Sequence, residues 1–335
     1  MARKKAQETA KHNSITTWPL YIVLVLAFIL YIIYQGSQSL AVIFGVMAFV
    51  ILVVLIGLEV VNGSRESGRL RSALEIIAAI AIVLIAWFAM KAILHTNYPI
   101  DAVPSCSMLP ALQRGDMILL QGTNASAINA PQVHVTQSGL QSMLGSINSE
   151  SLECVAYNVT GDTLYISQIV QPGYSVGLFK PSPGSAGGGS IVPYSSQSGN
   201  LVQYMCGTAN VVYGNGTVEQ EAYTKSITIG NRTITGDRNN SIVVYQTVPQ
   251  DSFYQDGDTY IVHRVYAVLN ASGTYYYLTK GDNNPGLDMQ YQNYPASQSH
   301  IEGKVIGKAP FLGYLKLILS GTLSQPAGCN SVLQD

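Results

Sequence analysis

Charged residues are scarce in this chain of 335 residues. Asp, Glu, Lys and Arg together make up 11% of it, against roughly 25% in a typical soluble protein. This shortage excludes an ordinary water-exposed surface over much of the chain and favours a membrane protein. The formal net charge is −1, so no excess of basic residues points to nucleic acid as a partner.

Long apolar runs are present only near the amino terminus, at 18–34, 40–61 and 76–94. A helix needs about 17–25 residues to cross the hydrocarbon core of a bilayer, so each run is long enough to span. The first run follows a basic segment, as the apolar part of a cleaved signal peptide does. It ends in bulky residues and lacks a small-x-small cleavage pattern, so we expect a retained helix. Residues 1–97 are therefore predicted to be a membrane anchor with three transmembrane helices.

The distribution of Lys and Arg predicts the orientation of these helices. The first 17 residues carry four basic side chains, the turn after the first run carries none, and the next connection carries Arg65, Arg69 and Arg71. Positively charged segments stay in the cytoplasm. We therefore expect a multi-pass protein of the plasma membrane with a cytoplasmic amino terminus, and everything from about His95 onward outside the cytoplasm.

Sequons and cysteines are compatible with an external domain. A sequon at Asn62 faces the cytoplasm on this topology, and six others fall in the predicted external part, at Asn124, Asn158, Asn215, Asn231, Asn239 and Asn270. Their occupancy stays open, because such triplets also arise by chance. Of the four cysteines, Cys154 and Cys206 are candidates for a disulfide in an oxidising compartment. The alternative is that all four cysteines are free.

Short β-branched and aromatic runs replace the helical pattern from Tyr98 on. Gly-Asp, Pro-Gly and Asn-Gly turns separate them. The runs lie at 117–121, 163–170, 226–229, 241–247, 259–269, 274–279 and 304–308. They predict a membrane-anchored all-β protein, in which about three amino-terminal helices precede an extracytoplasmic, partly barrel-like β domain.

Residues 123–255 are rich in Gly, Ser, Thr, Asn and Tyr and contain the linker-like run 181–190. We predict a large β insertion there. Half-buried strand tyrosines are favoured over a tyrosine binding surface; the residues concerned are Tyr157, Tyr165, Tyr174, Tyr194, Tyr204, Tyr213 and Tyr223. The chain ends in a tail, 314–335. The apolar segment 311–319 is too short to span, and either docks on the domain or lies in the membrane interface.

A candidate nucleophile follows the last apolar run by about ten residues, in the hexapeptide Ser105-Cys106-Ser107-Met108-Leu109-Pro110. A serine hydroxyl reacts only when a neighbouring base takes its proton. Besides His95 at the membrane edge, the external part offers His134, His263 and His300. His263 has the most suggestive setting, because its β-like run would hold an imidazole rigidly. Each histidine alone is more often an ordinary strand or surface residue.

An imidazole base works best beside a carboxylate that fixes its tautomer. Asp282 and Asp288 lie about twenty residues after His263, in the segment 279–288. Taken alone, this segment is an ordinary Gly/Asn/Pro turn with solvated acids. We interpret Gly115-Asp116 as a structural turn before the strand at 117–121.

Taken together, three motifs resemble those of the type I signal peptidases. They are Ser-x-Ser-Met-x-Pro-x-Leu-x-x-Gly-Asp, Ile-Val-His-Arg-Val and Thr-Lys-Gly-Asp-Asn-Asn-x-x-x-Asp. Residues 303–313 also resemble the closing strand and turn of that family. A histidine stands where the bacterial enzymes have a lysine, so the resemblance is to the archaeal and endoplasmic-reticulum branch. It implies a signal-peptidase-like catalytic core at 98–122 and 256–313.

The resemblance also implies roles for the catalytic residues. Ser107 would be the nucleophile and His263 the general base. Asp288 is the better candidate for orienting His263, with Asp282 supporting the site, although the choice between the two aspartates stays open.

Further roles concern the loop around the nucleophile. The Ser105 hydroxyl and the Ser107 backbone N–H would form the oxyanion hole. Met108 and Pro110 would shape the loop and the substrate-binding pocket. Cys106 replaces the small glycine common in this branch, which makes the local backbone a departure from the family pattern.

The implied activity is that of a membrane-bound serine endopeptidase that removes signal peptides from exported preproteins without a metal or other cofactor. Its partners would be those preproteins, the lipid bilayer and, as a further candidate, the protein-export machinery. One alternative is a protease of the same fold for a narrow set of surface or pilin-like substrates. Another is a catalytically inactive, membrane-anchored surface-binding protein.

Overall fold

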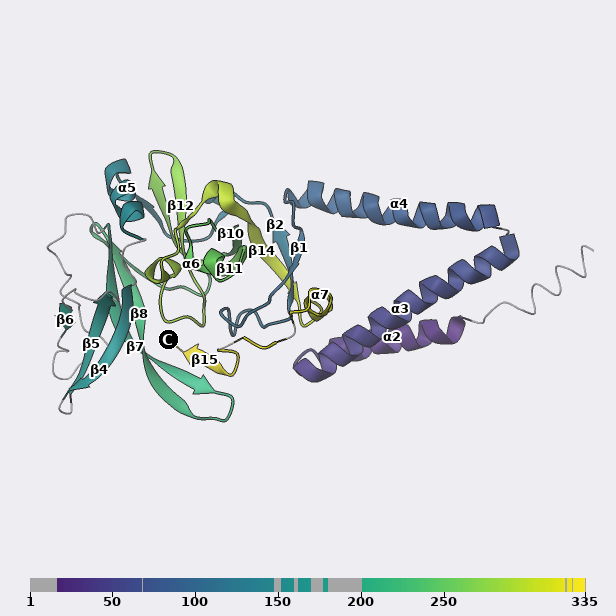
Figure 1. The fold of residues 1–335 in the computed structure, drawn as a ribbon, viewed down its shortest axis with the longest axis horizontal. Helices are drawn as coiled ribbons and strands as arrows, with labels where there is room; N and C mark the ends of the chain where they lie inside the picture. Colours follow the sequence, from purple (N-terminus) through teal and green to yellow (C-terminus); the bar gives the residue numbers. More distant parts are fainter. Residues whose placement is uncertain are drawn as a thin grey trace, which may run out of the picture.

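The architecture comes from a computed structural model, in which apolar helices extend from one end of a β-rich domain, the first two side by side and the third diverging from them (Figure 1). The structure describes residues 17–67, 69–147, 152–159, 162–169, 177–179, 201–322, 324–326 and 328–334. Side chains are described for most of these residues, with 63–67, 69–72, 75, 152–159, 162–169, 177–179 and 206 excepted.

From residue 17 to residue 94 the described chain forms three helices: α2 (Trp18–Ile33), α3 (Gln38–Ser67) and α4 (Arg69–Leu94). Two of them contain segments long and apolar enough to cross a membrane, Gln38–Asn62 and Ile76–Leu94. The side chains of the second segment are not buried against protein, as expected for a lipid-facing helix. Helix α2 is apolar but has only 16 residues. Two spans are therefore supported, and the third remains a prediction.

The main sheet has eight strands, in the order β1-β2-β14-β10-β11-β12-β13, with β3 pairing β11 in parallel. In chain order the strands are β1 (Ile100–Ala102), β2 (Met117–Gln121), β3 (Gln132–His134), β10 (Ile242–Gln246), β11 (Tyr260–Ala271), β12 (Thr274–Lys280), β13 (Ala296–Ser297) and β14 (Ile301–Ala309). Within the described residues no pairing joins β1 to β13, so the barrel-like shape stays a prediction.

Strand β11 lies at the centre of the core, because its apolar residues are buried on both faces of the sheet. One face packs against α5 (Gln137–Ser146) and strands of a second sheet, with Leu269 among the fully buried residues. The other face packs around Tyr245 and Val268. A rigid, doubly covered strand is therefore available to hold a functional side chain.

Two smaller sheets lie beyond the main one. The first has the order β15-β7-β8-β9, and the second the order β4-β5-β6. Their strands are β4 (Leu152–Val159), β5 (Asp162–Ile169), β6 (Gly177–Phe179), β7 (Val202–Tyr213), β8 (Val218–Ile229), β9 (Arg232–Thr235) and β15 (Ser331–Gln334). Tyr223 is buried and Tyr204 and Tyr213 are half-buried, as favoured from the sequence. The side chains of the other four tyrosines of this region lie outside the described residues.

The range 123–255 predicted as an insertion contains two strands of the main sheet. Strand β10 pairs with both β11 and β14, and β3 pairs with β11. These strands were assigned to the insertion because turn-rich sequence surrounds them. The main sheet therefore includes residues from inside that range, and the remaining division into a core and an insertion stays a prediction.

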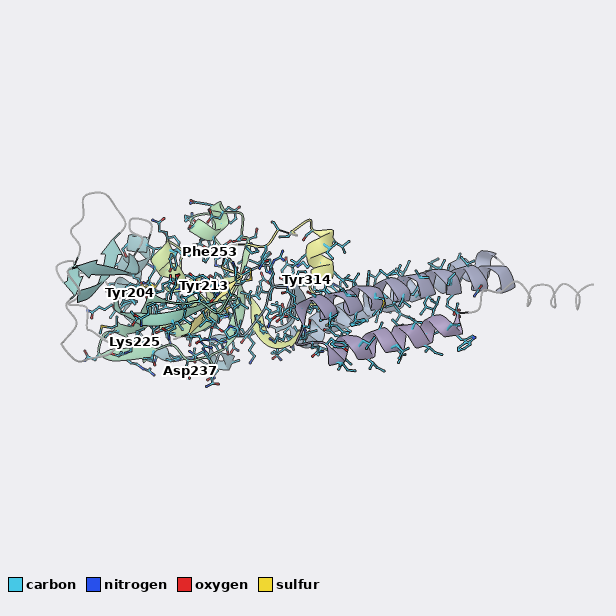
Figure 2. The ribbon with its side chains drawn as sticks, turned by 90° about the horizontal axis from the view of Figure 1, so that it is seen from below. Tyr204, Tyr213, Lys225, Asp237, Phe253 and Tyr314 are labelled. Carbon is cyan, nitrogen blue, oxygen red and sulfur yellow. A yellow bond between two sulfur atoms is a disulfide. The ribbon has the colours of Figure 1, made fainter. Side chains whose placement is uncertain are left out.

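The end of the α2–α3 hairpin contacts the β domain through the apolar segment before α7 (Tyr314–Leu319). The Tyr31 hydroxyl donates a 2.7 Å hydrogen bond to the Pro310 carbonyl, and Phe311 packs with Tyr31 and Ala41. Tyr314 lies where the helices meet the domain (Figure 2). Of the two placements left open for 311–319, docking is therefore observed for its first residues, while Leu319 at its end is 84% exposed.

Candidate active site

Ser107 lies on the loop between β1 and β2, and other residues of this loop anchor it to the core. Met108 is fully buried in an apolar cluster that includes Leu112 and Ile118. The buried Asp116 carboxylate accepts hydrogen bonds from the Gln113 and Phe311 backbone N–H groups. Asp116 therefore has the structural role expected for the turn. The loop holds Ser107 at the edge of the core, partly exposed.

His263 on β11 lies between Ser107 and Asp288. Its Nε2 is 3.0 Å from Ser107 Oγ, and its Nδ1 is 2.9 and 2.8 Å from the two carboxylate oxygens of Asp288. Both His263 and Asp288 are buried. Phe253 packs its ring edge to face with the imidazole, at 6.0 Å between centroids. The three groups therefore form one hydrogen-bonded chain that reaches solvent only at Ser107.

The charge of Asp288 fixes which nitrogen of His263 carries a proton. Burial raises the pKa of the Asp288 carboxyl, but His263 and hydrogen bonds from His263, Thr279 and Tyr245 outweigh that effect and leave this pKa below its ordinary value. An ionised carboxylate only accepts hydrogen bonds, so His263 Nδ1 must be the donor. Nε2 of a neutral imidazole is then free to accept the Ser107 proton.

Tyr245 on β10 is a member of this cluster that the sequence did not reveal. Its hydroxyl donates to Asp288 Oδ2 at 2.9 Å. Burial, followed by the nearby Asp288 charge, raises the pKa of Tyr245 well above its usual range. Val243 pairs with His263, and Tyr245 lies two residues further along on the same face. The register of β10 against β11 is the signal that could have identified it.

Asp282, expected to support the site, pairs with Arg264. Its carboxylate oxygens accept 2.7 Å hydrogen bonds from Arg264 Nε and Nη2. Arg264 Nη1 also donates to the carbonyls of Arg238 and Asn240, at 2.6 Å each. Asp282 therefore stabilises the turn after β12 through Arg264, and Asp288 is the aspartate that contacts His263.

Ser105 and Ser107 are close enough to act together. Their hydroxyl oxygens are 3.2 Å apart. The Ser107 carbonyl is held by a 2.7 Å hydrogen bond from the backbone N–H of Asn283. Both groups predicted to form an oxyanion hole are thus on one short, anchored segment, and the oxyanion role itself stays a proposal.

The two residues predicted to shape the substrate-binding pocket, Met108 and Pro110, differ in exposure. Met108 is 0% exposed and packs into the core, which speaks against a direct contact with substrate. Its packing is compatible with the expected role of shaping the loop. Pro110 is exposed and borders a cavity of about 760 Å³ that is also lined by Leu109, Tyr213 and Tyr314.

The other histidines considered as candidate bases lie away from Ser107. His134 is exposed on β3. His300 Nδ1 is 2.8 Å from Ser297 Oγ, and His95 follows the end of α4. Among the described residues, no group of three or more His, Cys, Asp or Glu is placed to hold a metal ion.

A disulfide joins Cys106 to Cys329, with their Cα atoms 5.0 Å apart. The alternative that all four cysteines are free is therefore wrong. The two partners are 223 positions apart in the sequence, so the sequence alone did not reveal their proximity. The suggested Cys154–Cys206 pair falls on side chains outside the described residues. Cys106 thus links the nucleophile loop to the carboxy-terminal tail.

The fold and site together define a β domain on apolar helices that carries a Ser–His–Asp hydrogen-bonded chain. Over 71 residues, 20% of its length, the chain is 37% identical to the signal peptidase complex catalytic subunit SEC11 of Verticillium alfalfae, of which it covers 40%. This partial similarity supports a signal-peptidase-like family over a fifth of the chain. No family model matches, and no solved structure matches.

Proposed function

We propose that this protein is a membrane-bound serine endopeptidase that removes signal peptides from exported preproteins. The observation that carries the proposal is the chain of contacts from Ser107 through His263 to Asp288, at 3.0 and 2.8 Å. The partial similarity to a signal peptidase subunit and the apolar helices next to the site support the same activity.

The proposed reaction begins when Ser107 Oγ attacks the carbonyl carbon of the scissile peptide bond. His263 Nε2 takes the Ser107 proton, and the ionised Asp288 stabilises the resulting imidazolium. The Ser107 N–H and the Ser105 hydroxyl would hold the developing oxyanion, and one such donor contributes about 10²–10³ in rate in other hydrolases. His263 then protonates the leaving amine, the peptide bond breaks, and water hydrolyses the acyl-enzyme with His263 again as the base.

The position of the site relative to the helices suits a membrane-embedded substrate. Helix α4 ends at Leu94, and Ser107 follows thirteen residues later. A signal peptide has an apolar segment followed by a cleavage site with small residues. We propose that this cleavage site meets Ser107 at the outer surface of the plasma membrane, where the preprotein leaves the bilayer and the export machinery.

The test is cleavage of a preprotein in detergent by wild type and by single alanine variants of Ser107, His263, Asp282 and Asp288. Loss of cleavage in Ser107→Ala and His263→Ala is expected. Retained activity in Ser107→Ala would end the proposal. Activity retained in His263→Ala alone would point to a lysine base, and Lys280 would be the first candidate.

The two smaller sheets favour a second candidate function, a protease for a narrow set of surface or pilin-like substrates. They lie beyond the main sheet, so they could recruit or restrict clients. Assays with several unrelated preproteins separate the two candidates, because cleavage of only one class would exclude general processing. The catalytically inactive binding protein is disfavoured, since Ser107, His263 and Asp288 are all present and in contact.

A further inference from the structure

The carboxy-terminal residues 328–334, here called the strap, lie directly against the nucleophile loop. Cys329 of the strap forms the disulfide with Cys106, the residue before Ser107. Residues 331–334 of the strap form strand β15, which pairs with β7 from Ser331↔Tyr213 to Gln334↔Asn210. The nucleophile loop is thereby joined to the β15-β7-β8-β9 sheet by one covalent bond and one strand.

Asn283 connects the same two segments with its side chain. Its Nδ2 lies 3.2 Å from the Cys106 carbonyl and 3.0 Å from the Ser331 carbonyl, and its Oδ1 accepts a 2.7 Å hydrogen bond from the Leu333 N–H. Ser331 and Leu333 are alternate residues of β15, so their polar groups point to one edge of the strand. The Asn283 amide therefore occupies the place that a neighbouring strand would take.

These contacts fix the direction of the Ser107 N–H. The Cys106 carbonyl and the Ser107 N–H belong to one planar, trans peptide group, so they point in opposite directions. Holding the Cys106 carbonyl with Asn283 Nδ2 sets where the Ser107 N–H points. The Asn283 backbone N–H holds the next carbonyl, that of Ser107, at 2.7 Å. Asn283 thus contacts both peptide groups that flank the nucleophile, and the Leu109 backbone N–H also donates to the Cys106 carbonyl, at 3.2 Å.

A buried arginine adds a second attachment of the tail to this loop. Arg114 Nε donates to the Pro104 carbonyl at 3.0 Å, and its Nη2 donates to the Thr322 carbonyl at 2.7 Å and the Ser324 carbonyl at 3.1 Å. This side chain therefore holds two residues of the tail that lead into the strap beside Pro104, the residue before Ser105.

We propose that the strap positions the nucleophile, with Asn283 as the positioning residue and the Cys106–Cys329 disulfide as its covalent lock. The inference rests on the proposed peptidase activity. When the lock or the Asn283 amide is lost, the Ser107 N–H and Oγ depart from the geometry that the reaction requires, while the surfaces that bind the substrate remain. The chemical step should slow, and substrate affinity should change little.

The first test measures kcat and KM for preprotein cleavage in detergent with Asn283→Ala and the matched control Asn330→Ala. Asn330 is an exposed asparagine of the strap. A displacement of reacting groups by about 1 Å costs on the order of 10² in rate, so we expect kcat of Asn283→Ala to fall by that factor with KM nearly unchanged. Asn330→Ala should match wild type. A rise in KM at constant kcat would overturn the proposal.

The second test keeps the wild-type sequence and reduces the disulfide, so that it does not depend on a variant that folds. Dithiothreitol supplies the two electrons and two protons that convert the Cys106–Cys329 bond into two thiols, and alkylation followed by mass measurement counts them. We expect kcat to fall at least about tenfold and to recover on reoxidation. Unchanged kcat after complete reduction would contradict the proposal that the Cys106–Cys329 disulfide positions the nucleophile.

Cysteine variants assign the effect to the correct pair. Cys154→Ser/Cys206→Ser should keep the sensitivity to dithiothreitol, whereas Cys106→Ser/Cys329→Ser should have the low kcat from the start and respond no further. The opposite pattern would overturn the inference. If oxidised wild type cleaves no preprotein at all, the proposed function itself fails, which is distinguishable from active enzyme that is indifferent to reduction.

Discussion

At the scale of single residues, the two aspartates after β12 have separate roles. Asp288 contacts His263 and accepts a hydrogen bond from the Tyr245 hydroxyl. Asp282 forms a bidentate ion pair with Arg264. The sequence presents both as acids of one turn. Their partners differ because His263 and Arg264 are consecutive residues of a strand, whose side chains point to opposite faces.

This separation predicts different outcomes for two matched substitutions. In Asp288→Asn the amide can offer its NH₂ to His263 Nδ1, which favours the tautomer that cannot accept the Ser107 proton. We expect kcat to fall by about 10⁴, as in other Ser–His–Asp hydrolases. Asp282→Asn should retain far more activity but lose about 3 kcal/mol of stability, because Arg264 loses its charged partner. Kinetics and chemical unfolding of both variants check this, and equal kcat values would contradict it.

The lowered pKa of Asp288 also predicts a dependence of stability on pH. A carboxyl whose folded pKa lies below its unfolded value stabilises the fold fully above the unfolded value, 3.8 here, and this contribution is lost as the pH falls through the lower folded pKa. The difference in unfolding free energy between wild type and Asp288→Asn should therefore shrink as the pH falls below about 3.8. Denaturant titrations across that range measure it, and a difference that grows toward acid would contradict the assignment.

At the scale of elements, the turn after β12 and the nucleophile loop form one closely packed unit. A Cβ on Gly281 would lie 2.7 Å from the Ser107 carbonyl oxygen and 2.8 Å from Asn284 Cγ. Because contacts that short do not persist, a side chain at this position must displace the nucleophile or the turn. The small residue in the Lys-Gly-Asp motif thus allows the acid-bearing turn to approach Ser107.

This close approach predicts the effect of Gly281→Ala. We expect the single-turnover rate of preprotein cleavage to fall by on the order of 10², with a smaller effect on the unfolding midpoint. Gly307→Ala on β14 is the control, since no heavy atom lies within 4 Å of a Cβ built there, and it should behave as wild type. Similar rates for the two variants would exclude a close contact at Gly281.

The sequence predicted some elements well and others poorly, for physical reasons. The run 117–121 coincides with β2, and β12 was predicted to within one residue, because both have dense apolar or β-branched patterns. Only the end of β8 was predicted, since its first four residues are exposed and three of them are charged or polar, Glu219, Gln220 and Glu221. Tyr245, the Arg264–Asp282 pair and the Cys106–Cys329 disulfide were missed because each depends on strand register or on contacts distant in the chain.

At the scale of the whole molecule, the two connections between the helices lie at opposite ends of the helical part. The junction of α3 and α4 lies at the end of the helices away from the sheets, and the α2–α3 turn lies at the end near α7 (Figure 1). The junction is the segment that contains Arg65, Arg69 and Arg71. This arrangement is compatible with the predicted orientation, in which basic segments stay in the cytoplasm.

Cysteine probes on the two sides test that orientation. In a Cys154→Ser/Cys206→Ser background, Gly145→Cys near Ser146 should react with a membrane-impermeant maleimide on intact cells. Gly145 is exposed on α5, and no heavy atom lies within 4 Å of a Cβ built there. Gly63→Cys, in the predicted cytoplasmic segment, should react only after permeabilisation. The reverse pattern would invert the proposed topology.

The most direct measurement of the central claim is cleavage of one signal-peptide-bearing preprotein by the purified full chain in detergent, comparing wild type with Ser107→Ala at equal folded concentration. The account predicts that wild type releases a mature protein with a single new amino terminus and that Ser107→Ala releases none above background. Cleavage by Ser107→Ala at the wild-type rate would contradict it.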